Sequence, residues 1–326
     1  MSTAHLAVLK WQIQPLLKEI NMSCKIMNLA DAVREIPYGA EIAIGGFAIT
    51  RSPVAFICEM IRQGKKDLNV YQSIVCMATD MLVGAGAVRK LSYGGGSLDR
   101  FGRMERINEA FENGTIDARE FSGLSLTYRF LAGSLGIPFI PTKTLLGTNI
   151  LENLIKKNDE SIMISTSPYD SEDKFVFIKA LNPEYAVIHA PYADEKGNVL
   201  IDGPVWDLEM AKAAKKLYVT VDQIVSNEFV KMHPEKVVIP NVFTQGVIEV
   251  PYGAYPTAVY KMYDYDSDML TKYAAINKRQ DEFDLFINQF VMGTKNHNEF
   301  LEKCGGISIL NKIKVDPIFG YKKIWG

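Results

Sequence analysis

The 326-residue chain is poor in the residues that build metal sites and disulfide frameworks. It has four cysteines and four histidines, and neither a C-x-x-C pair nor a closely spaced histidine pair occurs. Zinc sites and disulfide scaffolds depend on such spacing. We therefore expect no metal site and no disulfides, and reduced thiols fit a cytoplasmic protein. The cysteines are Cys24, Cys58, Cys76 and Cys304.

Long apolar runs are also missing, and no stretch reaches the length of a membrane span. The first 25 residues hold a short apolar stretch that Lys10 and Lys18 interrupt, without the order of a signal peptide. This segment is either an amphipathic cap or the product of an upstream start codon, since Met22 and Met27 follow. We interpret residues 1–26 as an N-terminal extension and residues 27–326 as one domain.

An excess of charge of either sign is absent as well. There are 36 basic and 38 acidic residues, the formal net charge is -2, and no basic block stands out. Nucleic acids and anionic membrane surfaces attract proteins through clustered positive charge. The sequence therefore predicts neither partner.

Several catalytic motifs are missing. Gly84 and Gly86 do not begin a G-x-G-x-x-G loop, because Arg89 stands at its last position, and Asp99 likewise breaks the loop that Gly94 and Gly96 would begin. There is no phosphate-binding G-x-x-x-x-G-K-[ST] loop, no G-x-S-x-G elbow and no H-E-x-x-H pair. These absences argue against a nucleotide enzyme, an α/β-hydrolase and a zinc protease.

Strand-like and helix-like segments alternate through most of the chain. This order is typical of an open, mainly parallel sheet with helices on both faces, which is the α/β fold class we predict. Phe283, Phe286, Ile287 and Phe290 recur at helical spacing, which predicts a C-terminal helical appendage. Ser165–Asp173 reads as a surface loop and Leu145–Gly147 as a short edge segment. The strand-like segments are 41–47, 69–76, 88–93, 174–181, 185–189 and 217–221, and the helical ones 99–113, 124–135 and 208–216.

Gly45 and Gly46 lie at the carboxyl end of the first predicted strand, the end at which open α/β sheets bind ligands. Backbone N–H groups there could stabilise an oxyanion, although a tight turn before a helix explains the glycines equally. Arg51 follows shortly after and could hold a carboxylate or phosphate, or lie on the surface. His189 could be a general base, but a hydrogen-bonded buried histidine is the simpler interpretation.

Glu112, Asn113 and Gly114 form a triplet that can hold a nucleophilic carboxylate. Here the triplet ends a polar helix, where a glycine in left-handed conformation is a common C-terminal cap. We therefore interpret it as a cap.

Taken together, these segments resemble the alpha subunits of family I CoA-transferases, and among them the glutaconate type. The resemblance runs over nearly the whole chain after about residue 27. It rests on ordered motifs, of which the last two are the most specific: IAIGGFAITRSP at 42–53, DMLVGAGAVRK at 80–90, GIPFIPTKTLLGT at 136–148, VIHAPYADEKGNVLIDG at 187–203, AKKLYVTVDQIVSNEF at 214–229 and VPYGAYPTAVYKMYDYD at 250–266.

The resemblance implies the fold that CoA-transferases share with some sugar-phosphate isomerases. It also implies a hetero-oligomer, expected to be α2β2, in which a beta subunit carries the catalytic glutamate in a Ser-Glu-Asn-Gly context. Coenzyme A is then a substrate, no cofactor is bound permanently, and this chain supplies no catalytic residue. Phe111 precedes Glu112 where the motif has serine, so the nucleophile is not carried over to Glu112.

The resemblance also assigns a substrate and oxyanion pocket. Gly45 and Gly46 are expected to contact the acyl group or its oxyanion, Phe47 to form a wall, and Arg51 to bind the distal carboxylate of a dicarboxylic acid. The chain departs from the family at 71–78 (YQSIVCMA), where the glutaconate type is glycine-rich, so Ser73 is expected to reach the pocket. We expect Gly94 and Gly95 to line the same cleft.

Two alternatives stay open. Relatives of these transferases hydrolyse acyl-CoA, open CoA-linked rings or decarboxylate CoA thioesters. The chain could also be a scaffold that only stabilises a partner.

Overall fold

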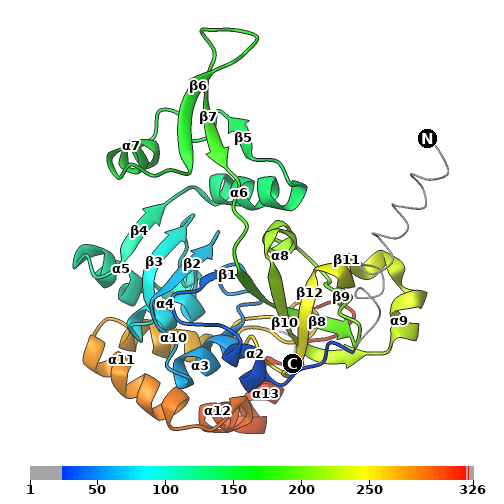
Figure 1. Cartoon of the computed structure of the whole chain (residues 1–326). Helices are drawn as coiled ribbons and strands as arrows, with labels where there is room; N and C mark the ends of the chain where they lie inside the picture. Colours follow the sequence, from blue (N-terminus) through cyan, green and yellow to red (C-terminus); the bar gives the residue numbers. More distant parts are fainter. Residues whose placement is uncertain (1–23, 321, 323–326) are drawn as a thin grey trace, which may run out of the picture.

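The central feature of the computed structural model, which describes residues 24–320 and 322, is a nine-stranded sheet (Figure 1). In space its strands follow the order β4-β3-β2-β1-β8-β10-β12, and all neighbours in this series are parallel. β9 joins the end of β8, and β11 joins β9, both antiparallel. The strands are β1 (Glu41–Ile44), β2 (Leu68–Gln72), β3 (Val88–Tyr93), β4 (Asp117–Glu120), β8 (Tyr185–Asp194), β9 (Val199–Leu200), β10 (Lys216–Val225), β11 (Val237–Ile239) and β12 (Thr244–Glu249).

Helices cover both faces of this sheet, as the sequence predicts. One face carries α2 (Leu29–Arg34), α3 (Val54–Arg62) and α4 (Met77–Gly84), and the other carries α6 (Gly123–Leu135) and α8 (Leu208–Ala213). Side chains alternate between the faces along each strand: Ile42 and Ile44 join the first core, and Ala43 joins the second. The remaining helices between the strands are α5 (Glu105–Glu112) and α9 (Asn227–Met232).

The predicted C-terminal appendage is part of the first core. It comprises α10 (Ser267–Ile276), α11 (Gln280–Phe286), a π-helical turn (Ile287–Met292), α12 (His297–Cys304) and α13 (Gly306–Ile313). Phe283, Phe286 and Phe290 of the predicted stripe are buried there, beside the residues of α3 and α4. The apolar stripe therefore packs on the helices of the main domain instead of forming a separate unit.

A small antiparallel sheet stands above the main one, and we call it and its helix the cap (Figure 1). Its strands run in the order β5-β7-β6, with bounds β5 (Phe139–Thr142), β6 (Ile162–Thr166) and β7 (Lys174–Lys179), and α7 (Asn149–Lys156) lies beside them. Of this sheet, β7 was predicted as a strand, at 174–181, whereas β5 and β6 were not. The surface loop expected at Ser165–Asp173 begins inside β6 and connects it to β7. The edge segment expected at Leu145–Gly147 is not a strand, and the edge strand β5 precedes it in the chain.

Among residues 24–320, no helix is long and apolar enough to cross a membrane. The same residues contain no group of three or more cysteine, histidine, aspartate or glutamate side chains placed to hold a metal ion. The predicted N-terminal extension falls mostly on residues 1–23, which lie outside the described part of the chain.

His297 at the start of α12 makes the fold sensitive to acid. Burial lowers the pKa of His297 to about 4, and its Nε2 donates to the Tyr252 carbonyl at 3.0 Å while its buried Nδ1 has no partner. Because the unfolded chain takes up this proton near pH 6.5 and the folded chain does not, stability is lost as pH falls from 6.5 towards 4. The carboxyl of Asp80 acts in the opposite direction: burial raises its pKa to about 6, so its contribution is lost as pH rises through 6.

We expect His297→Gln, which keeps a side-chain donor but does not titrate, to remove this acid sensitivity. The wild-type free energy of unfolding should fall by about 2 kcal/mol more than that of the variant between pH 7 and pH 5. Urea unfolding at the two pH values measures the difference, and Asp80 cancels because both proteins contain it. Equal slopes for the two proteins would contradict the assignment to His297.

Candidate functional site

The side on which new strands join the sheet changes at β1. β2, β3 and β4 are added on one side of β1, and the chain then crosses to place β8 on the other side. Ligands of open α/β sheets bind outside the carboxyl ends of the strands at such a switch point. Gly45, Gly46 and Phe47, which we call the glycine loop, lie at this end of β1.

The glycine loop is held in a tight turn by its own backbone. Gly46 has a φ of 88°, which favours glycine, and Phe47 and Thr50 exchange N–H···O=C bonds of 2.9 Å in both directions. The Gly45 N–H donates to the Val187 carbonyl at 2.8 Å, which continues the pairing of β1 with β8. The Gly46 N–H donates to Asp207 Oδ2 at 3.2 Å. All three N–H groups of the loop are therefore bonded within the chain.

A buried ion pair lies behind the glycine loop. Arg51 donates from Nη1 to Asp207 Oδ2 and from Nη2 to Asp207 Oδ1, both at 3.1 Å, and the two side chains are 3% and 2% exposed. The guanidinium also donates to the carbonyls of His189 and Pro204, each at 3.2 Å. Because Asp207 accepts from both Gly46 and Arg51, its carboxylate ties the loop to the residue that follows it.

The segment 250–266, one of the two most specific motifs in the sequence, supports the loop from outside. The Arg51 N–H donates to the Ala258 carbonyl at 2.8 Å, and the Ala258 N–H donates to the Ile49 carbonyl at 2.9 Å. The Ser52 N–H donates to Thr257 Oγ1 at 3.2 Å. These bonds explain why a motif about 200 residues away in sequence belongs to the same site.

A cavity of about 310 Å³ opens beside the glycine loop, and we call it the glycine-loop cavity. Its walls are mostly apolar and come from the ends of β1 and β2, the start of α6 and the residues before α8. Its two hydroxyls are hydrogen-bonded within the chain: Ser73 Oγ lies 3.3 Å from Thr127 Oγ1, and Thr127 Oγ1 donates to the Gly123 carbonyl at 2.8 Å. The lining residues are Ile44, Gly45, Gly46, Phe47, Ser73, Ile74, Gly123, Leu124, Thr127, Trp206, Asp207 and Met210.

A second cavity, of about 350 Å³, shares the side chains of Phe47 and Trp206 with the first. The two rings stack with their centroids 4.8 Å apart. The second cavity is rich in tyrosine and includes Tyr260, Tyr263 and Tyr265. The Phe47–Trp206 stack is therefore a wall common to both cavities, and Trp206 is still 58% exposed.

The structure brings together most of the residues that the sequence analysis selected. Gly45, Gly46, Phe47 and Ser73 all line the glycine-loop cavity. Gly94 lies behind it, where its N–H donates to the Ser73 carbonyl at 3.1 Å, and a Cβ at Gly94 would lie 2.6 Å from the Cα of Gly123. Gly95 accepts from the Val75 N–H at 2.9 Å. Neither Gly94 nor Gly95 is among the residues that line this cavity, so contact with a substrate stays a prediction for both.

Two interpretations made from sequence concern residues outside the cavity. His189 is fully buried, with Nδ1 2.9 Å from Thr220 Oγ1 and Nε2 3.1 Å from Asp222 Oδ2, as expected of a hydrogen-bonded buried histidine. Glu112 is the last residue of α5 and is exposed, and Gly114 has a φ of 64°. The interpretation of this triplet as a helix cap is confirmed.

Asp207 and Trp206 were missed by the sequence analysis. Asp207 directly precedes α8, where an aspartate normally caps the helix through its side chain, but here it makes no such bond. Its carboxylate turns to Arg51 instead. An aspartate and an arginine 156 residues apart give no local signal of pairing.

The fold and the cavity define an α/β protein with a small, mainly apolar pocket at the switch point of its sheet. The sequence model of the coenzyme A transferase family matches residues 26–250. The A subunit of glutaconate CoA-transferase from Acidaminococcus fermentans is 32% identical over 315 residues, which cover 91% of this chain and 97% of that protein. The A subunit of 3-oxoadipate CoA-transferase from Pseudomonas knackmussii is 31% identical over 284 residues, or 86% and 98% of the two chains.

Solved structures agree with these relatives. The glutaconate coenzyme A-transferase of Acidaminococcus fermentans superposes with a TM-score of 0.86 at 31% identity, over 91% of this chain and 98% of that one. The decarboxylase AibA/AibB superposes with a TM-score of 0.72 at 28% identity, over 82% and 100%. The chain belongs to the coenzyme A transferase family and is similar to the A subunits of its glutaconate and 3-oxoadipate members.

Proposed function

We propose that this chain is the alpha subunit of a CoA-transferase that moves coenzyme A between an acyl-CoA and a small carboxylic acid. The observation that carries the proposal is the glycine-loop cavity, which is small, mostly apolar and placed at the switch point of the sheet. Its volume suits a short acyl group. The similarity to glutaconate and 3-oxoadipate CoA-transferase subunits supports the same reaction.

The reactive carboxylate is proposed to come from a beta subunit with a Ser-Glu-Asn-Gly glutamate, in an α2β2 assembly. The lining of the glycine-loop cavity supports this division, because its only carboxylate, Asp207, is bonded to Arg51 and to Gly46. The partner's glutamate attacks the thioester carbonyl, and CoA leaves as the thiolate. The thiolate then attacks the glutamyl carbonyl of the anhydride, which releases the first acid and leaves an enzyme–CoA thioester. The second acid reverses these steps.

The glycine loop has two possible parts in this chemistry. First, it shapes the cavity. Gly45 packs so closely on its neighbours that a Cβ would lie 2.7 Å from the Ile188 side chain and 2.8 Å from Asp207, so a larger residue would displace the loop. An oxyanion role for the Gly46 N–H requires that the oxyanion take the place of Asp207 as its acceptor. Similarly, a dicarboxylic substrate that uses Arg51 has to replace Asp207 as the partner of the guanidinium. If Arg51 binds the distal carboxylate, glutarate should accept CoA faster than butyrate, and transfer rates with the two acids measure this preference.

Reconstitution tests the division of labour between the subunits. The purified chain alone should show no transfer, and adding a partner that carries the Ser-Glu-Asn-Gly glutamate should restore it. Borohydride should inactivate the complex only after acyl-CoA is added, because the enzyme–CoA thioester is the reducible species. Glu112→Gln is the matched control and should keep full activity, since this exposed carboxylate ends a helix. Transfer by the chain alone, or loss of activity in Glu112→Gln, would contradict the proposal.

A second candidate function keeps the fold and changes the reaction. The similarity to a decarboxylase at a TM-score of 0.72 favours decarboxylation of an acyl-CoA as the alternative. The partner's residue at the glutamate position and the need for a free carboxylic acid in turnover distinguish the two. Turnover without any acceptor acid would favour the decarboxylase or a thioester hydrolase.

A further inference from the structure

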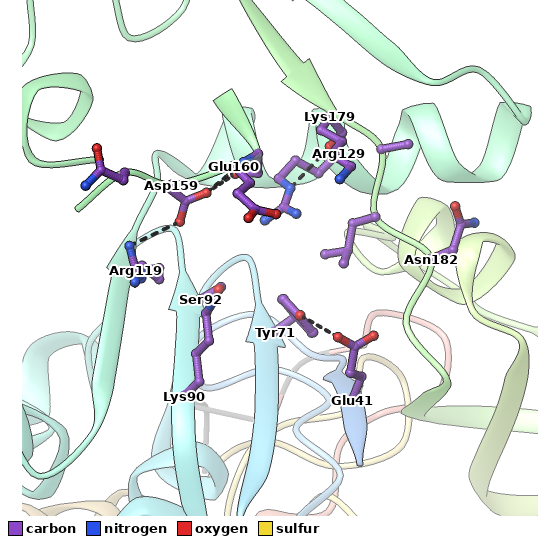
Figure 2. Close-up of a pocket in the computed structure, with 14 residues that line it drawn as sticks. Glu41, Tyr71, Lys90, Ser92, Arg119, Arg129, Asp159, Glu160, Lys179 and Asn182 are labelled. Carbon is purple, nitrogen blue, oxygen red and sulfur yellow. Dashed lines mark hydrogen bonds and ion pairs between the residues drawn. The ribbon is translucent and has the colours of Figure 1, made fainter. Parts of the chain in front are cut away.

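A third cavity, of about 550 Å³, lies between the main sheet and the cap, and it has no part in the function proposed above. Figure 2 shows Tyr71 and Glu41 on the sheet below it and Arg129 reaching in from above. Its lining is strongly polar, with four basic and three acidic side chains. We call it the cap cavity.

The cap cavity lies over one face of the main sheet, at β2, β3 and the edge strand β4. Tyr71 lies opposite Ser92 in the pairing of β2 with β3, and Ser92 lies opposite Arg119 in the pairing of β3 with β4. Central strands of a parallel sheet that is covered on both faces are normally apolar on both. Polar side chains in register on three neighbouring strands therefore indicate a surface that faces a polar ligand or solvent.

Arg129 on α6 is the main feature of this cavity. The residue is 8% exposed, its Nε donates to the Lys179 carbonyl at 3.3 Å, and its guanidinium carbon lies 5.2 Å from the centre of the Phe121 ring. These contacts use one N–H group and one face of the planar guanidinium. Within the described chain, no acceptor is hydrogen-bonded to its Nη1 or Nη2, and neither atom is fully enclosed. Its outer edge is thus fixed in orientation and open to the cavity.

A fixed guanidinium edge with open N–H groups is a receptor for the two oxygens of a carboxylate or phosphate. The Ser92 hydroxyl is a further donor on the sheet. Tyr71 lies beside it, but its single phenolic hydrogen is donated to Glu41 at 3.3 Å, so Tyr71 is no free donor while that bond holds. The buried Ser92 hydroxyl has no hydrogen-bond partner in the described chain, and it is not fully enclosed. Both hydroxyls also line the cavity.

The charges that remain uncommitted restrict the ligand. Arg119 bonds Asp117 at 2.9 Å and lies 3.7 Å from Asp159, so it is neutralised. Arg129 and Lys179 have no ion pair within the described residues, and the exposed Glu160 also lines the cavity. Burial lowers the pKa of Arg129, although Asp159 and Glu41 act to raise it. Glu160 and Glu41 would repel a large polyanion. A compact anion is therefore favoured over a nucleotide.

We propose that the cap cavity binds the oxyanion group of a small polar acid, a carboxylate or a phosphate, through the Nη edge of Arg129. The site is separate from the glycine-loop cavity, since the two share no lining residue. Binding therefore does not depend on whether the chain is a transferase subunit.

Isothermal titration of the full-length chain with inorganic phosphate and with acetate tests the proposal. At least one anion should bind in a saturable way, and Arg129→Met should weaken its binding at least about tenfold, the effect of losing a bidentate charged contact. The exposed Arg34→Met is the matched control and should bind as the wild type does. Binding of phosphate alone, or of acetate alone, then identifies the class of acid.

A second variant protects the test against a folding defect in Arg129→Met. Glu160 is exposed and lines the cavity, so Glu160→Gln should leave the melting temperature unchanged. Because it removes a negative charge from the cavity, it should tighten anion binding about threefold. The proposal is overturned if neither anion binds, or if a folded Arg129→Met and Glu160→Gln both bind with wild-type affinity.

Discussion

Gly46→Val is expected to abolish CoA transfer, and Gly46→Ala to lower kcat about 100-fold, the cost of a displacement of about 1 Å in a catalytic site. A Cβ on Gly46 would lie 2.8 Å from the Arg51 carbonyl oxygen and 2.9 Å from both the Cα and the N of Ser52. These are backbone atoms, so no side-chain rotation relieves the contact. The loop has to move, and it would move into or away from the glycine-loop cavity that it lines.

Gly39→Ala is the control that separates this contact from simple backbone strain. Gly39 also has a positive φ, 75° against 88° for Gly46, but a Cβ there meets nothing within 4 Å. Both alanine variants therefore have a similar left-handed strain, of about 1–2 kcal/mol. Only Gly46→Ala adds the collision. Steady-state transfer rates and co-purification with the partner subunit distinguish the outcomes.

Two results would count against this role of Gly46. If Gly39→Ala lost as much activity as Gly46→Ala, the effect would be a general loss of stability. If Gly46→Val assembled with its partner and kept full turnover, a scaffold subunit would become the better interpretation of the chain. Loss of turnover with assembly intact is the expected outcome.

The parts of the fold that follow a local rule were predictable from sequence. β3 (Val88–Tyr93) was predicted residue for residue, and α6 within one residue of its start, because Gly136 takes the left-handed conformation that ends the helix. β2 was predicted too long, since the chain leaves the sheet after Gln72: Ser73 and Ile74 line the cavity, and Cys76 is the N-cap of α4. Position in the fold overrides strand propensity there.

The cap shows what local patterns do not contain. Only Val176 and Ile178 of β7 are fully buried, because one side of the small sheet faces outward. On that outward side Phe139 stacks on Phe177 at 4.9 Å, and Phe139 and Met163 are exposed. Apolar residues on an exposed face blur the alternation that identifies a strand. The middle strand β7 was nevertheless predicted, at 174–181, and the strands that flank it, β5 and β6, were not.

The candidate site was predicted only where its residues carry a local signal in the sequence. The glycines after β1 carry a local signal, so their position at the cavity could be inferred before the fold was known. The state of Arg51 could not, because its charge partner comes from a distant segment. Free and neutralised arginines look identical in a sequence. The difference matters, because it decides whether Arg51 meets a substrate directly or holds the glycine loop in place.

Asp207→Ala is expected to destabilise the chain by about 3–5 kcal/mol, the usual result of removing one partner from a buried ion pair. Arg51 would keep only the carbonyls of His189 and Pro204, and the Gly46 N–H would lose its acceptor. The exposed pair of Lys231 and Glu228, 68% and 76% exposed, provides the control, and Glu228→Ala should have little effect on stability. Urea unfolding measures both variants.

The double variant Arg51→Met/Asp207→Leu decides what the pair is for. Because it leaves no buried charge without a partner, it should be more stable than Asp207→Ala alone, and a double-mutant cycle should show strong coupling. Its activity should nevertheless stay low, since no carboxylate then accepts from the Gly46 N–H or ties the loop to Arg51. Additive losses of stability would contradict the pairing. Recovery of transfer together with stability would show that the pair acts on folding alone, whereas stability without transfer assigns Asp207 and Arg51 to positioning the glycine loop.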